Sequence, residues 1–579
     1  MRRRSVLTIT ALSSLLFAAA AMRLSPRLSS AFAAQAQNPQ TSSQPAPTTA
    51  QLVNAKLTPA ANPAKLSSLA VTNAATETYT AKRGETIPTI ARQYLKRTAY
   101  LTSTELAEAI RQTNGNLSAN ILKAGQQITI PGILPEPITE KTIPVPRDFE
   151  VRAIYLTGIM AASDHGLRII RHWREVGGNA VVFDIKDSDG SVTIPFEHPL
   201  LGKHQVYIHD LPKFVHFLHS ENMHAIARIA IFRDERLVVQ HPELAVHSKK
   251  TGQPWRENGK LVWTDSSNPT VQDYNIALAK FVAQSGADEI QFDYVRFPAE
   301  GDQKDATFVY QTEHPDSDKE SVTQMKADKS SVCSESAATS GPAPKGQKNA
   351  AHGASRAIAD DQIKQAPEGR KSGCTSPTRT LQRSDVITAF LKKAYAELHP
   401  TGVLLSLDVF GVMAWQRPVD LSHTGQDIVG MAKYCDVLSP MIYPSHFFGM
   451  DNIDHPGDAP EHFIGESMQR FELITKGSGV VIRPWLQAFH WRTKTYSPEY
   501  IKVQVATAKE KGGIGFLFWN AANDYSKPYE AMPEMKAADL NEGSKDKAKY
   551  FRGDELSTIT TVKASLTPQP IQTPVSPLY

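Results

Sequence analysis

Eight short apolar segments, each able to form a buried strand, recur along the chain and alternate with helical patterns. The apolar segments are residues 151–156, 180–185, 224–231, 289–295, 403–409, 437–443, 482–489 and 514–519. The helical patterns between them include residues 167–176, 211–222, 271–284, 386–398 and 498–511. Strands that alternate with helices form parallel sheets, and eight such units predict an α/β fold, a closed (β/α)8 TIM barrel over residues 150–540. A doubly wound sheet would carry a Gly-rich phosphate-binding turn after the first strand, and Thr157-Gly158-Ile159 is not one.

Polar residues interrupt several of these apolar segments near their C-terminal ends, where such barrels carry their chemistry. Alternation along a strand points six of these side chains toward the barrel axis: Asp184, Lys186, Gln291, Asp293, Ser406 and Asp408. Tyr443, Gln487 and the pair Trp519-Asn520 end three further strands. Carboxylates beside aromatic rings suit sugars, because glycoside hydrolysis uses paired carboxylates and sugar faces pack on flat apolar surfaces.

Each of these residues also has a structural interpretation, which the sequence leaves open. Asp184 and Lys186 would form an ion pair inside the barrel, Asp293 would hold Arg296, and Asp408 would cap a neighbouring loop. Tyr443, Trp485 and Trp519 suit core packing as readily as sugar stacking.

A separate pattern in residues 78–132 predicts a small βααβ module. A strand around Tyr79 leads into the turn Gly84-Glu85-Thr86, helical patterns follow at 87–94 and 105–113, and Asn114-Gly115 signals a turn before a last strand ending at Pro131. This order resembles a LysM domain, with Glu85 in place of the more usual Asp. The resemblance implies binding of peptidoglycan or another N-acetylglucosamine-containing glycan; a spacer without ligand is the alternative.

The ends of the chain predict export and flexible segments. Three arginines at positions 2–4, an apolar segment at 6–22 and Ala31-Phe32-Ala33 are typical of a signal peptide over residues 1–33, with an uncleaved anchor as the alternative. The protein is therefore expected to be secreted, periplasmic or in the cell envelope. Residues 34–77, 302–383 and 541–579 are too poor in apolar residues to fold, and we expect disorder there.

Composition disfavours other classes. The net charge is +4 and no Lys/Arg stripe stands out, so we expect no nucleic-acid partner. No segment after the signal region is long and apolar enough for a membrane span. Cys333, Cys374 and Cys435 are not spaced as metal pairs, and the first barrel strand lacks a His-x-His pair, so no metal or other cofactor is expected. A disulfide between Cys333 and Cys374 and two free thiols stay equally open.

The barrel segments resemble a bacterial family of glycoside-hydrolase-like barrels, long catalogued as a domain of unknown function. The resemblance is carried by DEIQFDYVRFP at 288–298, NAVVFDIKD at 179–187, ARIAIF at 227–232, SLDVFG at 406–411, SPMIYPSH at 439–446 and PWLQAF at 484–489. It implies an amylase-like arrangement in which the strand-four Asp293 is the nucleophile and the strand-five Asp408 is the proton donor. Two features depart from that pattern: Asp408 stands where Glu is common, and a long polar insert follows Glu300.

Together these observations predict a secreted glycosidase that cleaves a cell-wall or extracellular polysaccharide. Asp293 and Asp408 are the expected catalytic pair. The expected substrate-binding residues are Asp184, Arg228, Arg296, Tyr443, Gln487, Trp519 and Asn520. The alternative is a barrel of the cell envelope that binds polysaccharide without cleaving it.

Overall fold

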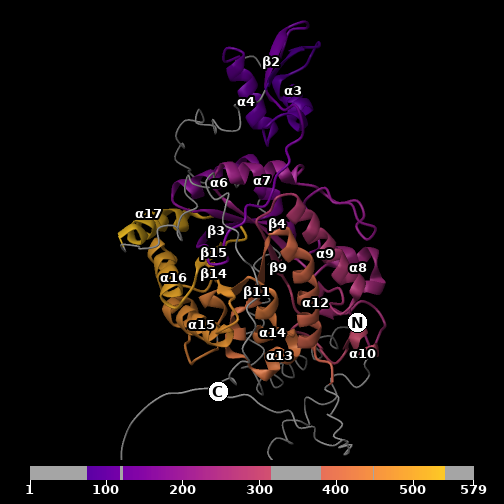
Figure 1. Ribbon diagram of the computed structural model, residues 1–579, viewed down its shortest axis with the longest axis vertical. Coiled ribbons are helices and arrows are strands. Elements are labelled where there is room, and N and C mark those ends of the chain that lie inside the picture. The colour runs from indigo at the N-terminus through magenta and orange to yellow at the C-terminus, as the bar shows by residue number, and fades with distance from the viewer. Residues whose placement is uncertain (1–74, 118–120, 314–379, 448, 542–579) are drawn as a thin grey trace, which may run out of the picture.

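The computed structural model describes residues 75–117, 121–313, 380–447 and 449–541. They form a small indigo unit at the N-terminal side and a large barrel beside it (Figure 1). The expected signal peptide, most of residues 34–77, nearly all of the C-terminal tail and the two cysteines Cys333 and Cys374 lie outside the described residues.

The barrel is a closed ring of parallel strands, which confirms the predicted fold. Its strands are β3 (Val151–Leu156), β4 (Ala180–Lys186), β5 (His224–Ala230), β9 (Glu289–Asp293), β11 (Leu404–Phe410), β12 (Val437–Ile442), β13 (Val481–Ile482) with β14 (Trp485–Gln487), and β15 (Gly515–Trp519). Each strand pairs in parallel with its neighbours, and the β15–β3 and β11–β12 pairings close the ring. Figure 1 shows the strands arranged in a ring inside the helices.

Helices follow the strands and cover the outside of the ring. They include α6 (Asp164–Glu175), α7 (Leu211–Ser220), α9 (Pro269–Gln284), α12 (Arg383–Leu398), α15 (Pro460–Thr475), α16 (Pro498–Glu510) and α17 (Ser526–Asn541). Side-chain N-caps begin four of them: Ser163, Asp210, Asn268 and Ser497 each accept a bond from the first turn. The predicted helices are confirmed within a few residues, and α15 and α17 are additional to them.

The seventh strand is split, whereas the sequence predicts one strand over 482–489. Arg483 and Pro484 separate β13 from β14. Proline has no N–H for the ladder, yet its carbonyl still accepts from Leu517 N at 2.9 Å, so the two halves stay in the sheet. The Arg483 guanidinium bonds both carboxylate oxygens of the buried Glu289 at 3.0 and 2.8 Å.

Alternation holds for most strands, and one predicted orientation is wrong. Phe292, Leu405 and Leu407 lie in the large core between sheet and helices, as expected. Lys186 does not face the axis, because the β4–β5 register shifts between Asp184 and Lys186. Its ammonium instead pairs with Asp234 at 2.7 Å, so the ion pair with Asp184 does not form.

The small unit has the predicted βααβ order. Strand β1 (Ala75–Thr80) pairs antiparallel with β2 (Gln127–Ile133), and helices α3 (Ile87–Tyr94) and α4 (Ser103–Thr113) pack against them. Asn114 fixes the end of α4, because its side-chain amide bonds both the N–H and the carbonyl of Thr129. Three polar contacts dock this unit on the barrel: Arg171 with Glu105 at 3.0 Å, Lys213 Nζ with the Leu95 carbonyl at 2.9 Å, and Thr102 with Asp164 at 2.5 Å.

Residues 134–150 connect the two units and lie across the N-terminal end of the barrel. Glu140 bonds His216 at 2.7 Å, and Ile143 N donates to the Asp288 carboxylate at 2.7 Å. Arg147 bonds the Gly479 carbonyl at 2.9 Å, and Phe149 packs into the inner core of the barrel. These contacts come from helices and strands on several sides of the ring, so the connection is part of the barrel structure.

Residues 302–313, which the sequence assigns to a disordered insert, have a described structure. Strand β10 (Ala306–Thr307) pairs with β6 (His247–Ser248), and helix α10 (Val309–Glu313) follows. Phe308 and Tyr310 are buried, and this apolar anchor explains why the first part of the segment is ordered. The remainder of the predicted insert, up to residue 379, lies outside the described residues.

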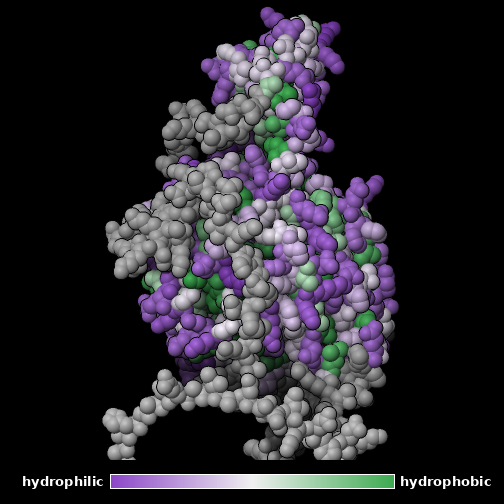
Figure 2. Space-filling model, viewed as in Figure 1, coloured by the Kyte–Doolittle hydropathy of each residue, from purple (hydrophilic) through white to green (hydrophobic). Residues whose placement is uncertain are grey.

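Over the residues with a described structure, no helix combines the length and apolar character needed to cross a membrane. The visible face of the barrel in Figure 2 is mainly hydrophilic, with hydrophobic residues scattered between polar ones.

Candidate active site

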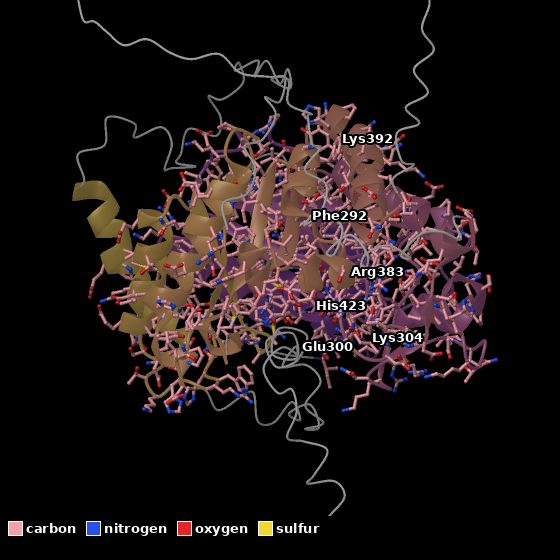
Figure 3. The ribbon with its side chains drawn as sticks, turned by 90° about the horizontal axis from the view of Figure 1, so that it is seen from below. Phe292, Glu300, Lys304, Arg383, Lys392 and His423 are labelled. Atoms are coloured by element: carbon pink, nitrogen blue, oxygen red, sulfur yellow. The ribbon has the colours of Figure 1, made fainter. Side chains whose placement is uncertain are left out.

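The C-terminal ends of the strands define one end of the barrel, here called the mouth. Figure 3 shows the barrel from the side: Glu300 and Lys304, in the segment after β9, lie toward the mouth, and Lys392 in α12 lies toward the opposite end. The predicted carboxylates lie on strands of this ring, near or within its mouth.

Arg228 on β5 joins two of the predicted carboxylates. Its Nη1 donates to Asp184 at 2.5 Å, while Nε and Nη2 donate to Asp293 Oδ2 at 3.1 and 2.5 Å. All three side chains are nearly inaccessible, with Asp293 the most exposed at 7%. Burial raises the pKa of Asp184 to about 7, although Arg228 opposes that shift. The sequence left open an ion pair between Asp293 and Arg296. In the structure Asp293 instead pairs with Arg228.

Asp408 lies on the neighbouring strand, one step beyond the Leu407–Phe292 pair, which places it beside Asp293. Its Oδ1 accepts a hydrogen bond from Trp485 Nε1 at 2.7 Å. Burial raises the pKa of Asp408 well above its usual range, and the negative charge of Asp293 raises it further. The surroundings of Asp408 therefore favour its protonated form, whereas Asp293 lies against the Arg228 guanidinium.

Two aromatic rings from strands β3 and β15 lie next to this group. Tyr155 stacks on Trp519 with ring centroids 4.1 Å apart, and Arg228 lies 5.4 Å from the Trp519 ring. The Tyr155 hydroxyl donates to Asp184. Sequence reasoning missed Tyr155, although alternation from Ala153 along 151–156 already points it toward the axis.

The backbone is strained at the residue that follows Asp293. Tyr294 has a φ of 55°, a left-handed conformation that non-glycine residues rarely adopt. In this conformation its N–H donates to Asp293 Oδ1 at 2.6 Å. Strain of this kind concentrates at functional sites, where the surrounding structure has to hold it in place.

Tyr443 and Arg296, two further residues predicted to bind substrate, are both buried among aromatic or charged groups. Tyr443 lies beside the carboxylates: burial raises its pKa far above the usual range, and the charges of Asp408 and Asp293 add to that shift. Arg296 lies between the rings of Trp263 and Phe410, 4.5 Å from each.

Two predicted amides are occupied by the backbone of nearby loops. Gln487 bonds the carbonyl of Phe489 and the N–H of Ser445. Asn520 bonds the carbonyls of Ala488 and Asp524. Both residues therefore fix loops at the mouth. Each amide nitrogen already donates to two backbone carbonyls.

Metal ligands do not gather in this part of the structure. Within the described ranges no group of three or more His, Cys, Asp and Glu side chains could hold a metal ion. A surface cavity of about 340 Å³ lies between the loop after β4 and α8 (Glu235–Gln240), lined among others by Asp189, Lys203 and Arg236. Neither Asp293 nor Asp408 lines it.

A TIM barrel with adjacent carboxyl groups and aromatic rings at its mouth has the arrangement that glycoside hydrolysis uses. The family comparison agrees: residues 153–525 match the family described as "Putative glycosyl hydrolase domain", and residues 79–131 match the LysM domain. The chain belongs to this glycosyl hydrolase family and carries an N-terminal LysM domain. It is a carbohydrate-acting enzyme.

Solved structures with detectable similarity are more distant. A hypothetical protein from Ruminiclostridium thermocellum ATCC 27405 is 37% identical over 27% of this chain and 80% of its own, with a TM-score of 0.25. The PgaB (BpsB) glycoside hydrolase domain from Bordetella bronchiseptica is 12% identical over 66% of this chain and 99% of its own, with a TM-score of 0.43. The spore cortex-lytic enzyme SleL from Bacillus megaterium QM B1551 is 12% identical over 79% of this chain and 85% of its own, with a TM-score of 0.33. No curated protein matches the chain, and the family assignment rests on the sequence match.

Proposed function

We propose that this protein is an exported glycosidase that cleaves a cell-wall or extracellular polysaccharide with Asp293 as nucleophile and Asp408 as general acid. One observation carries the proposal: two neighbouring carboxyl groups at the mouth have opposite electrostatic environments. Glycosidases give two carboxyl groups different roles, one as nucleophile and one as proton donor, and such roles need different surroundings.

Asp293 has the surroundings of an anion. It accepts three N–H groups, two from the Arg228 guanidinium and one from the Tyr294 backbone. Asp408 has one neutral donor, Trp485, and burial raises the pKa of Asp408. The first group suits attack on the anomeric carbon, and the second, whose protonated form is favoured by burial, suits proton donation.

The reaction follows from these two states. An Asp293 oxygen forms a bond to the anomeric carbon while the glycosidic C–O bond breaks, and the Asp408 proton moves to the departing oxygen. Water then attacks the glycosyl ester, Asp408 accepts a proton from that water, and Asp293 leaves as a carboxylate. Proton and charge balance are restored after each turnover.

The strand arrangement favours retention of the anomeric configuration. Neighbouring strands lie about 4.8 Å apart, and Asp293 and Asp408 come from adjacent strands at adjacent register positions. This matches the separation of roughly 5–5.5 Å found in retaining enzymes better than the roughly 6.5–9.5 Å of inverting ones.

The LysM domain supports a polymeric, N-acetylglucosamine-containing partner such as peptidoglycan. Its contacts with α6 and α7 hold it next to the barrel, so a glycan bound there is kept near the barrel at high local concentration. The N-terminal residues 1–33 support export to the place where such polymers occur.

The test is hydrolysis by the purified full chain of four polymers: peptidoglycan glycan strands, poly-N-acetylglucosamine, an α-glucan and a galactan. We expect new reducing ends from at least one polymer, and NMR of the first product is expected to show retained configuration. Binding without any new reducing ends would instead support the non-catalytic barrel.

A further inference from the structure

Four aromatic side chains gather at the ends of β12 and β14, next to the proposed acid. Tyr443 and His446 follow β12, and Phe489 and Trp491 follow β14. We refer to these four residues as the aromatic shelf. Tyr443 and His446 are buried, while Phe489 and Trp491 are half-buried and reach the surface.

The rings of the aromatic shelf contact one another in sequence. Tyr443 lies 5.4 Å from His446 and 5.7 Å from Phe489, and His446 lies 4.8 Å from Trp491. The exposed Arg492 places its guanidinium 4.6 Å from the Trp491 ring. The surface thus combines flat apolar faces with N–H donors, the two features that bind sugar rings and their hydroxyls.

Gln487 holds both halves of the aromatic shelf together. Its carbonyl accepts from Ser445 N at 3.2 Å, and its amide donates to the Phe489 carbonyl at 3.0 Å and to the Trp491 carbonyl at 3.4 Å. Gln504 in α16 exchanges two hydrogen bonds with the Gln487 backbone. This buried amide therefore positions the loops and is itself fixed by a helix.

His446 contributes an uncharged ring. Burial lowers the pKa of His446 to about 3, and Arg492 adds to that shift. Its Nδ1 lies 3.2 Å from the Ser445 hydroxyl. A neutral imidazole between aromatic neighbours keeps the aromatic shelf free of positive charge at its centre at physiological pH.

The position of the aromatic shelf relative to Asp293 and Asp408 indicates on which side of the cleaved bond its sugar would lie. Tyr443 lies beside Asp408, whereas Arg228 and Asp184 lie on strands on the other side of Asp293. An acid protonates the departing oxygen, so the leaving group lies on the acid's side of the site. We propose that the aromatic shelf is the subsite for the sugar on the leaving-group side of the cleaved bond, with Gln487 as its positioning residue. This inference rests on the proposed function for the roles of Asp293 and Asp408.

The test compares a polymer with a substrate too small to reach the aromatic shelf. The variants are Trp491→Ala and Trp491→Leu, which keeps an apolar side chain but removes the flat ring. Leu473→Ala is the control, because Leu473 is 65% exposed and lies in α15, away from the mouth. On the polymer that the wild type cleaves, both Trp491 variants are expected to lose roughly tenfold in kcat/KM. The second substrate is a glycosyl fluoride, in which fluoride replaces the sugar on the leaving-group side. On this substrate both Trp491 variants are expected to match the wild type, because fluoride needs no leaving-group subsite.

A second readout works without turnover. Each protein is run in native gels that contain one of the four polymers named above, where binding slows migration. Slower migration of the wild type and of Leu473→Ala, but not of Trp491→Ala, supports the aromatic shelf as a sugar-binding surface even if no polymer is cleaved. The inference is overturned if the Trp491 variants equal the wild type on every polymer in both assays, or if they lose fluoride and polymer turnover equally. Absence of all turnover in the wild type would count against the proposed function alone.

Discussion

Replacing Arg228 by methionine tests whether the buried guanidinium holds the two aspartates together. The variant leaves Asp184 and Asp293 buried without their shared cation, and loss of one partner from a buried ion pair costs about 3–5 kcal/mol. At roughly 2 °C per kcal/mol for a domain of this size, Tm is expected to fall by roughly 6–10 °C at pH 7.5.

The loss is expected to shrink at lower pH. Arg228 lowers the pKa of Asp184, so its removal raises that folded-state pKa further above the unfolded value of 3.8. A carboxyl group whose pKa is raised by folding stabilises the protein below the unfolded pKa and loses that contribution as pH rises. The variant is therefore closest to the wild type near pH 4.5.

The assay is thermal unfolding of both proteins from pH 4.5 to 7.5. Arg233→Met is the matched control, because Arg233 is also nearly buried and bonds the Tyr294 hydroxyl at 2.8 Å. A Tm loss for Arg228→Met that is no larger than for the control, or that does not change with pH, would refute the reasoning.

Three further predictions concern protonation and binding. Burial raises the pKa of Asp184 to about 7, so the wild type is expected to lose stability between about pH 4 and 7, and Asp184→Asn is expected to lose less; parallel Tm–pH curves would contradict this. The Trp485 N–H lowers the pKa of Asp408, so Trp485→Phe is expected to move the alkaline limb of the pH–rate profile upward; an unmoved limb would argue against Asp408 as the acid. Deletion of residues 75–133 is expected to abolish sedimentation with insoluble peptidoglycan while glycosyl fluoride turnover continues; undiminished sedimentation would remove the glycan-binding role of the LysM domain.

The sequence predicts the barrel well because each strand is a buried apolar segment between helical patterns. The inward orientation of Asp293 and Asp408 follows from alternation on strands without irregularities. The orientation of Lys186 could not be predicted in this way, because the register shift after Asp184 reverses the face of the strand.

Contacts between strands were beyond the sequence pattern. The pairing of Arg228 with both aspartates depends on which strands are neighbours and on the register between them. The sequence of a single strand defines neither. The predicted sugar-binding role of Gln487 and Asn520 followed from their place at strand ends. The structure shows that backbone groups of the following loops, whose paths the sequence does not define, occupy their amides.

The central claim is that Asp293 and Asp408 form a catalytic pair, and paired measurements of turnover and Tm on Asp293→Asn and Asp408→Asn test it most directly. Asn keeps the shape of Asp but can neither attack the anomeric carbon nor donate a carboxylic proton. The account predicts loss of polymer hydrolysis in both variants with the fold retained. Undiminished hydrolysis by Asp293→Asn would contradict it, as would a collapse in Tm that accounts for the whole loss of activity.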